Sequence, residues 1–179
     1  AQPIVHDFGR IVGTTAVDPI IDAAGTLRDL RVYVSFLDTN NSRSVSLLRF
    51  NSQFEFVSET LLTKISPAEF YPLHVQKFGS SGRRLFGSGK SQSSQANDYV
   101  SYTLSDDGIP TGARKVWFNN ATGMSPAGGF VTRDGGMAGS LTQIQSAPGL
   151  MFRRCLRPIN VSANPGSSVC NDIDGFTHV

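Results

Sequence analysis

Few residues in this chain have the types and spacing that covalent catalysis requires. A cysteine nucleophile at Cys155 or Cys170 would need a histidine base, and the three histidines are His6, His74 and His178. His6 and His178 are close to the ends of the sequence, where chains usually fray. We therefore predict no cysteine–histidine pair, and we expect His74 to be packed or half-exposed rather than catalytic.

Carboxylates and phosphate-binding loops give equally weak signals. A glycosidase needs two carboxylates that face one cleft, but Glu55 alternates with two phenylalanines and is expected to face solvent. Asp172-Ile173-Asp174-Gly175 matches only part of a calcium-binding loop. Gly87-Ser88-Gly89-Lys90-Ser91 ends like a P-loop, but Arg84 occupies the place of its first glycine. We predict no enzyme activity, no metal site and no cofactor.

Arginine is the basic residue that this chain uses most. Of its 16 Lys and Arg residues, only four are lysines. Arg is enriched in protein interfaces, where Lys and Glu are depleted, and its guanidinium binds carboxylate or phosphate through two hydrogen bonds. The candidate contacts to a partner or to phosphate are Arg83, Arg84, Arg114, Lys115, Arg153, Arg154 and Arg157.

The expected partners are copies of the same chain or other structural subunits. Nucleic acid is not favoured, although Trp117 beside Arg114 and Lys115 is the kind of aromatic residue that stacks on bases. The formal net charge is only +2, and no basic tail is present to neutralise a phosphate backbone.

Cys155 and Cys170 are candidates for a disulfide. A bridge between them would close a loop of about 16 residues and would contribute roughly 3 kcal/mol in the chain-entropy model. Two free, partly buried thiols are the alternative, and the sequence does not decide between them.

The sequence shows no sign of membrane insertion. It contains no apolar run of the ~18 residues that a spanning helix needs. It begins with Ala1-Gln2-Pro3-Ile4, which lacks the basic and apolar regions of a signal peptide, so that either a signal was removed or none was present.

The elements that would position these residues are mostly strands. Apolar side chains alternate over residues 30–36 and again over residues 45–56, and turn-forming residues 38–42 separate the two runs. This pattern predicts a long antiparallel hairpin. The alternation changes phase at Leu47-Leu48, which predicts a β-bulge at that point.

The remaining strands are predicted to be short and separated by turns, while helix signals are few. Asp18-Pro19 resembles a helix start, and Ser66-Pro67-Ala68-Glu69 leaves room for about one turn. We therefore predict an all-β antiparallel sandwich or barrel with long loops, an extended N-terminal arm and at most two short helices. The further predicted strands are residues 99–104, 114–118, 130–133, 141–145 and 150–159.

The 179 residues are enough for one domain with an appended arm. Residues 1–19 are β-prone but irregular, and we expect them to form the N-terminal arm. Residues 20–179 are then a single β-rich domain. Within it, residues 79–98 are rich in Gly, Ser and Gln, which predicts a flexible loop.

Two functions of different classes fit these observations. The first is a structural assembly protein, above all a virion or phage coat, decoration or tail subunit that acts through subunit–subunit contacts in a virion or an extracellular assembly. The alternative is a secreted or surface β-sandwich binding module for carbohydrate or protein. It would use aromatic residues that the pattern places at exposed positions, namely Tyr33, Tyr99 and Trp117.

Overall fold

The computed structural model of this chain is all-β, and no helix occurs in the part that it describes. For residues after Trp117, the structure describes the strands and their pairing but almost no side chains. The described residues are 7–40, 42–65, 70–78, 82–90, 97–118, 125–131, 137–146, 150–159, 167 and 169–174.

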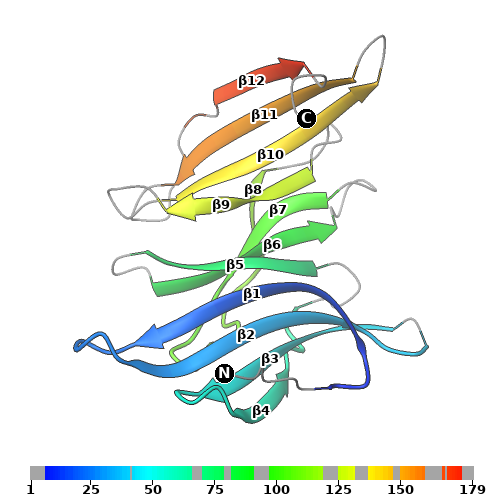
Figure 1. Ribbon diagram of the computed structural model, residues 1–179. Coiled ribbons are helices and arrows are strands. Elements are labelled where there is room, and N and C mark those ends of the chain that lie inside the picture. The colour runs from blue at the N-terminus through cyan, green and yellow to red at the C-terminus, as the bar shows by residue number, and fades with distance from the viewer. Residues whose placement is uncertain are drawn as a thin grey trace.

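The strands form three antiparallel sheets of four strands each, and every sheet follows the chain order (Figure 1). The first sheet is β1 (Ile11–Ile21), β2 (Leu27–Leu37), β3 (Arg43–Asn51) and β4 (Phe56–Leu61). The second is β5 (Phe70–Phe78), β6 (Gly82–Lys90), β7 (Asn97–Thr103) and β8 (Lys115–Phe118). The third is β9 (Ser125–Val131), β10 (Met137–Ser146), β11 (Leu150–Ile159) and β12 (Val169–Asp174). The predicted all-β antiparallel class is confirmed.

The main core lies between the first and second sheets. Every second residue of a strand points to the same face, and the facing sides of these two sheets carry apolar residues. β5 lies beside β1 (Figure 1), and β9 of the third sheet approaches β5, β6 and β7. The buried core residues are Ala16, Tyr33, Val45, Leu47, Leu62, Ile65, Phe70, Leu85, Val100, Tyr102 and Leu104.

The first sheet carries apolar residues on both faces. Leu47 belongs to the main core, whereas its neighbour Leu48 packs with Val34 and Phe36 on the opposite face. The pairing of β2 with β3 runs without interruption from Asp29–Asn51 to Leu37–Arg43. The predicted hairpin is therefore confirmed. The β-bulge predicted at Leu47-Leu48 is wrong, because the change of phase reflects burial on two faces.

The N-terminal part of the chain differs from its expected structure. The helix predicted after Asp18-Pro19 is wrong, since these residues lie in β1 and pair with β2, with Asp18 opposite Arg31. The extended arm predicted over residues 1–19 is also wrong from Ile11 onward, because these residues belong to strand β1 of the first sheet. Asp18 is buried between the sheets rather than placed at a helix start. Residues 1–6 of the expected arm lie outside the described residues.

The flexible loop predicted over residues 79–98 is wrong for Gly82–Lys90, which is strand β6 in the middle of the second sheet, while residues 79–81 and 91–96 lie outside the described residues. A flexible loop was predicted from its Gly and Ser content, but Leu85 and Phe86 are fully buried. Its glycines permit close packing: a Cβ at Gly87 would lie 2.4 Å from the Phe70 Cζ atom. The helical turn predicted at residues 66–69 lies outside the described residues.

Replacing Gly87→Ala is expected to destabilise the protein by ~2 kcal/mol or more, because overpacking forces backbone and side chains apart. The added methyl group would also lie 2.4 Å from the Tyr71 carbonyl oxygen, which is main chain and cannot rotate away. Gly112→Ala is the matched control, since its nearest neighbour would be Thr103 at an ordinary 3.9 Å. Urea unfolding measures both variants, and equal free energies of unfolding would contradict the packing argument.

In the third sheet, Cys155 and Cys170 are directly paired positions of β11 and β12. Paired Cα atoms of antiparallel strands are about 4.5–5.5 Å apart, which lies inside the range of about 4.4–6.8 Å that a disulfide spans. The register is thus compatible with the bridge, which stays a prediction.

Intact mass spectrometry after alkylation tests the bridge. We expect no alkylation of Cys155 or Cys170 before reduction and alkylation of both afterwards. A Cys155→Ser/Cys170→Ser variant is expected to lose roughly 3 kcal/mol of stability, the value for a loop of this length. Two alkylated cysteines in the unreduced, unfolded protein would exclude the bridge.

Candidate functional site

The structure separates the basic residues that the sequence grouped together. Arg83 and Arg84 are neighbours on β6 and therefore point to opposite faces of the second sheet. Arg83 lies on the side that faces the first sheet, and Arg84 lies on the other side, near Trp117. The remaining predicted contacts on the third sheet are placed only by their register, as residues of β11: Arg153, Arg154 and Arg157.

Arg83 belongs to a charged network between the first two sheets. Its Nε donates a hydrogen bond to Asp18 Oδ1 at 3.2 Å. Asp29 Oδ2 accepts hydrogen bonds from Arg31 Nε at 3.1 Å and Arg49 Nη2 at 2.8 Å. Burial raises the pKa of the Asp18 carboxyl, although the charges of Arg83 and Arg31 oppose this. These contacts give Arg83 a role in joining the two sheets.

Two other basic residues of the second sheet, Arg84 and Lys115, lie close to Trp117. The Lys115 Nζ atom lies 4.2 Å and the Arg84 guanidinium carbon 5.9 Å from the indole ring centroid. Arg114 is held by an ion pair of 2.9 Å with Asp98. Trp117 is only 3% exposed, so its ring cannot stack on a nucleobase. The structure therefore brings Arg84 and Lys115 together without forming the base-stacking surface that nucleic-acid binding would use.

The three aromatic residues expected at exposed positions are buried, and that prediction is wrong. Tyr33, Tyr99 and Trp117 are 0%, 1% and 3% exposed. The Tyr33 hydroxyl donates to the Gly108 carbonyl oxygen at 2.9 Å. Tyr33 lies in the main core, whereas Tyr99 and Trp117 pack against Phe86 on the second sheet. None of the three rings can serve as a platform for a sugar.

His74 is packed in an aromatic layer on the second sheet. Its ring stacks on Phe86 with centroids 5.0 Å apart, and its Nε2 lies 3.1 Å from the Tyr99 hydroxyl oxygen. Burial lowers the pKa of His74 to about 4. The imidazole is therefore neutral at pH 7, and its surroundings are those of a packed residue.

Because the pKa of His74 falls from 6.5 to about 4 on folding, the unfolded chain binds the extra proton more tightly. Stability is then complete above pH 6.5 and is lost as the pH falls towards 4, by about 3 kcal/mol. His74→Phe keeps an aromatic ring and removes the titration. The difference between the urea unfolding free energies of wild type and variant, measured from pH 7 to 4, should show this slope; a difference independent of pH would contradict it.

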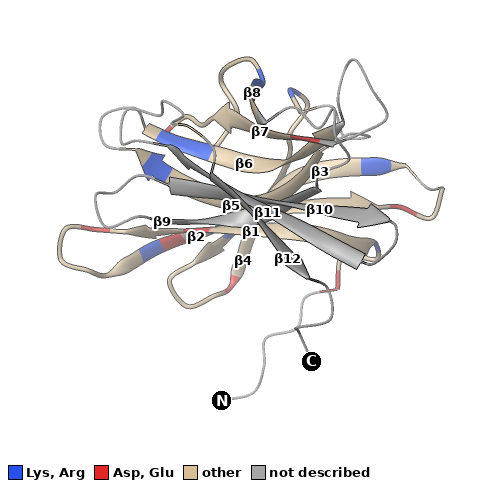
Figure 2. Ribbon diagram, turned by 90° about the horizontal axis from the view of Figure 1, so that it is seen from above, with Lys and Arg blue, Asp and Glu red and all other residues tan. Residues whose placement is uncertain are grey.

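The surface that the sequence did not identify is apolar and lies on the first sheet. Of the nine large hydrophobic residues exposed in the described part of the chain, eight belong to this sheet or its β3–β4 turn, and Val116 is the exception. Charged residues are spread thinly over the described strands (Figure 2). The eight residues are Ile11, Val12, Val17, Ile21, Phe54, Phe56, Val57 and Leu61.

Four of these exposed residues share the face of the first sheet that points away from the main core. The strand register places Val17 beside Val32, and Phe56 beside Phe50. We call this surface the outer apolar face and define it by Val12, Val17, Leu30, Val32, Val34, Phe36, Leu48, Phe50, Phe56 and Leu61.

Residues that precede β1 cover part of the outer apolar face. The Phe8 ring lies 5.5 Å from Phe36 and 5.7 Å from Phe56 between centroids. The Arg10 guanidinium carbon lies 3.9 Å above the Phe36 ring, and its Nη2 pairs with Glu59 Oε2 at 2.6 Å. Val12, Val17, Phe56 and Leu61 stay exposed beside this cover.

β4 forms an edge of the first sheet, because it pairs only with β3 in the described part of the chain. Natural edge strands usually carry Lys, Pro or free charges that discourage pairing with another chain. β4 has neither Lys nor Pro. Its only charged residue, Glu59, accepts hydrogen bonds from Arg10 and from Ser46 Oγ at 2.7 Å. Arg10 thereby lowers the pKa of Glu59 and neutralises its charge.

Two other features are absent from the described residues. These residues contain no group of three or more His, Cys, Asp or Glu side chains arranged to hold a metal ion. Nor do they include a helix with the length and hydrophobicity to cross a membrane. Comparisons with protein-family models, curated proteins and solved structures give no match for this chain.

Proposed function

We propose that this chain is a structural assembly protein that acts through contacts between subunits, in the manner of a virion or phage coat, decoration or tail subunit. The observation that carries the proposal is the concentration of exposed hydrophobic residues on one sheet. Monomeric soluble proteins rarely expose large contiguous apolar patches, and those that occur usually mark interaction sites.

The outer apolar face has the composition of an interface between subunits. Val17 is 51% and Leu61 is 56% exposed, so a neighbouring subunit could remove a large part of each side chain from water. Each Å² of apolar surface removed from water contributes roughly 25 cal/mol, and permanent interfaces are the more hydrophobic ones.

The edge strand β4 adds a second way to bind a neighbouring subunit. An incoming strand could use the main-chain groups on its open side, which is how strand addition joins subunits. Val57 and Leu61 would flank such a junction, and the charge of Glu59 is already neutralised by Arg10. This combination supports assembly through the first sheet.

The ion pairs support apolar rather than ionic contacts between subunits. Arg83, Arg114 and Arg49 each pair with an aspartate of the same chain. Arg83 and Arg114 were predicted to contact a partner or phosphate, but the charges of all three arginines are already matched within the fold. The binding-module alternative loses its expected aromatic platform, and no other observation favours it.

Val17→Asp and Leu61→Asp test the proposal, with Val116→Asp as the matched control. Val116 is similarly exposed, at 48%, but lies on β8 outside the first sheet. We expect the wild type to form discrete oligomers or particles by light scattering and electron microscopy. A charge placed within an apolar contact should weaken association by a factor of ten or more, on the order of 2 kcal/mol.

The control variant should assemble like the wild type, and circular dichroism should show that all three variants are folded. A wild type that stays monomeric at every concentration would overturn the proposal. Equal loss of assembly in Val116→Asp would show that the first sheet is not the interface.

A further inference from the structure

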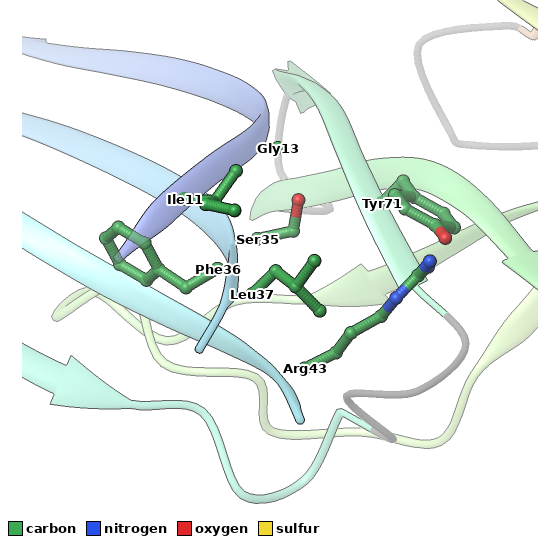
Figure 3. Close-up of a pocket in the computed structure, with 7 residues that line it drawn as sticks. All are labelled: Ile11, Gly13, Ser35, Phe36, Leu37, Arg43 and Tyr71. Carbon is green, nitrogen blue, oxygen red and sulfur yellow. The ribbon is translucent and has the colours of Figure 1, made fainter. Parts of the chain in front are cut away.

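A small hollow lies at one end of the first sheet, between β1, β2 and β5 (Figure 3). Its volume is about 130 Å³, close to that of an engineered cavity of about 150 Å³ that binds benzene. The hollow can therefore hold one ring or a short aliphatic group. Seven residues line it: Ile11, Gly13, Ser35, Phe36, Leu37, Arg43 and Tyr71.

The hollow depends on an irregularity in β1. The register with β2 shifts between Val12 and Thr15, where two residues of β1 have no regular partner. Ser35 Oγ accepts a hydrogen bond from the Thr14 amide at 2.9 Å and holds this irregular segment in place. A Cβ at Gly13 would lie 2.5 Å from Ser35 Oγ, so the close approach requires glycine.

One end of the hollow is apolar and the other carries a positive charge. Ile11, Phe36 and Leu37 supply hydrocarbon walls. Arg43 extends from the start of β3 towards Tyr71, and its guanidinium carbon lies 4.9 Å from the ring centroid (Figure 3). This contact with the ring orients the cation beside the opening.

Arg43 differs from most arginines of the described part of the chain. Six others pair with a carboxylate, at distances from 2.6 to 3.2 Å. Among the described residues, no carboxylate lies within ion-pair distance of Arg43.

We propose that this hollow binds a small monocarboxylate with an aromatic or short aliphatic body. The body would lie against Ile11, Phe36 and Leu37, while the carboxylate would accept hydrogen bonds from Arg43, whose planar guanidinium suits a carboxylate.

Equilibrium dialysis with radiolabelled benzoate tests this site whatever the assembly state of the protein. We expect saturable binding with a dissociation constant on the order of 1 mM, as suits a ligand of this size. Benzyl alcohol, which has the ring without the charge, should compete at least about fivefold more weakly, in line with an exposed ion pair.

Arg43→Gln should weaken benzoate binding by roughly fivefold, and Arg43→Lys should retain part of it, since it keeps the charge but loses the planar fork. Arg28→Gln is the matched control, because Arg28 is an exposed arginine outside the hollow that pairs with Asp22. The proposal is overturned by an absence of saturable benzoate binding, by equal binding of benzoate to Arg43→Gln and wild type, or by an equal loss in Arg28→Gln.

Discussion

Burial of apolar side chains on both faces of the first sheet is the constraint on which most of this structure depends. One face meets the second sheet through Tyr33 and Leu47, and the other gathers Val34, Phe36 and Leu48. A sheet between two layers is covered on both sides, whereas in the described part of the chain the second side is covered by Phe8 and Arg10 alone. The exposed remainder of that face follows directly from this imbalance.

The charged residues between the first two sheets connect one sheet to the other. Asp18 and Arg31 are 6% and 5% exposed, and they meet Arg83 and Asp29 in the space between the sheets. Buried ion pairs contribute little net stability, but removing one partner leaves an uncompensated charge. A sliding of one sheet over the other would separate Asp18 from Arg83 and leave a buried charge without its partner.

The sequence allowed the fold class and the β2–β3 hairpin to be predicted, because alternation is a local signal. β1 was mistaken in part for a helix start, since Asp18-Pro19 has the residue types of one, yet proline is tolerated on a strand at the edge of a sheet. β6 was mistaken for a loop because its glycines are typical of loops. Gly87 is needed instead for close packing against Phe70, and that contact is visible only in the tertiary structure. The outer apolar face was missed because alternation identifies faces but not which of them stays uncovered.

The short segment that carries Phe8 and Arg10 performs two tasks on the outer apolar face at once. Phe8 shields the rings of Phe36 and Phe56, while Arg10 balances the carboxylate of Glu59 on the edge strand. Moving this segment away would thus uncover more hydrocarbon and, in the same step, leave a net negative charge beside it. The exposed apolar area and the electrostatic repulsion between two such faces would therefore increase together. The negative charge of Glu59 would then oppose the nonspecific association that the newly exposed rings favour.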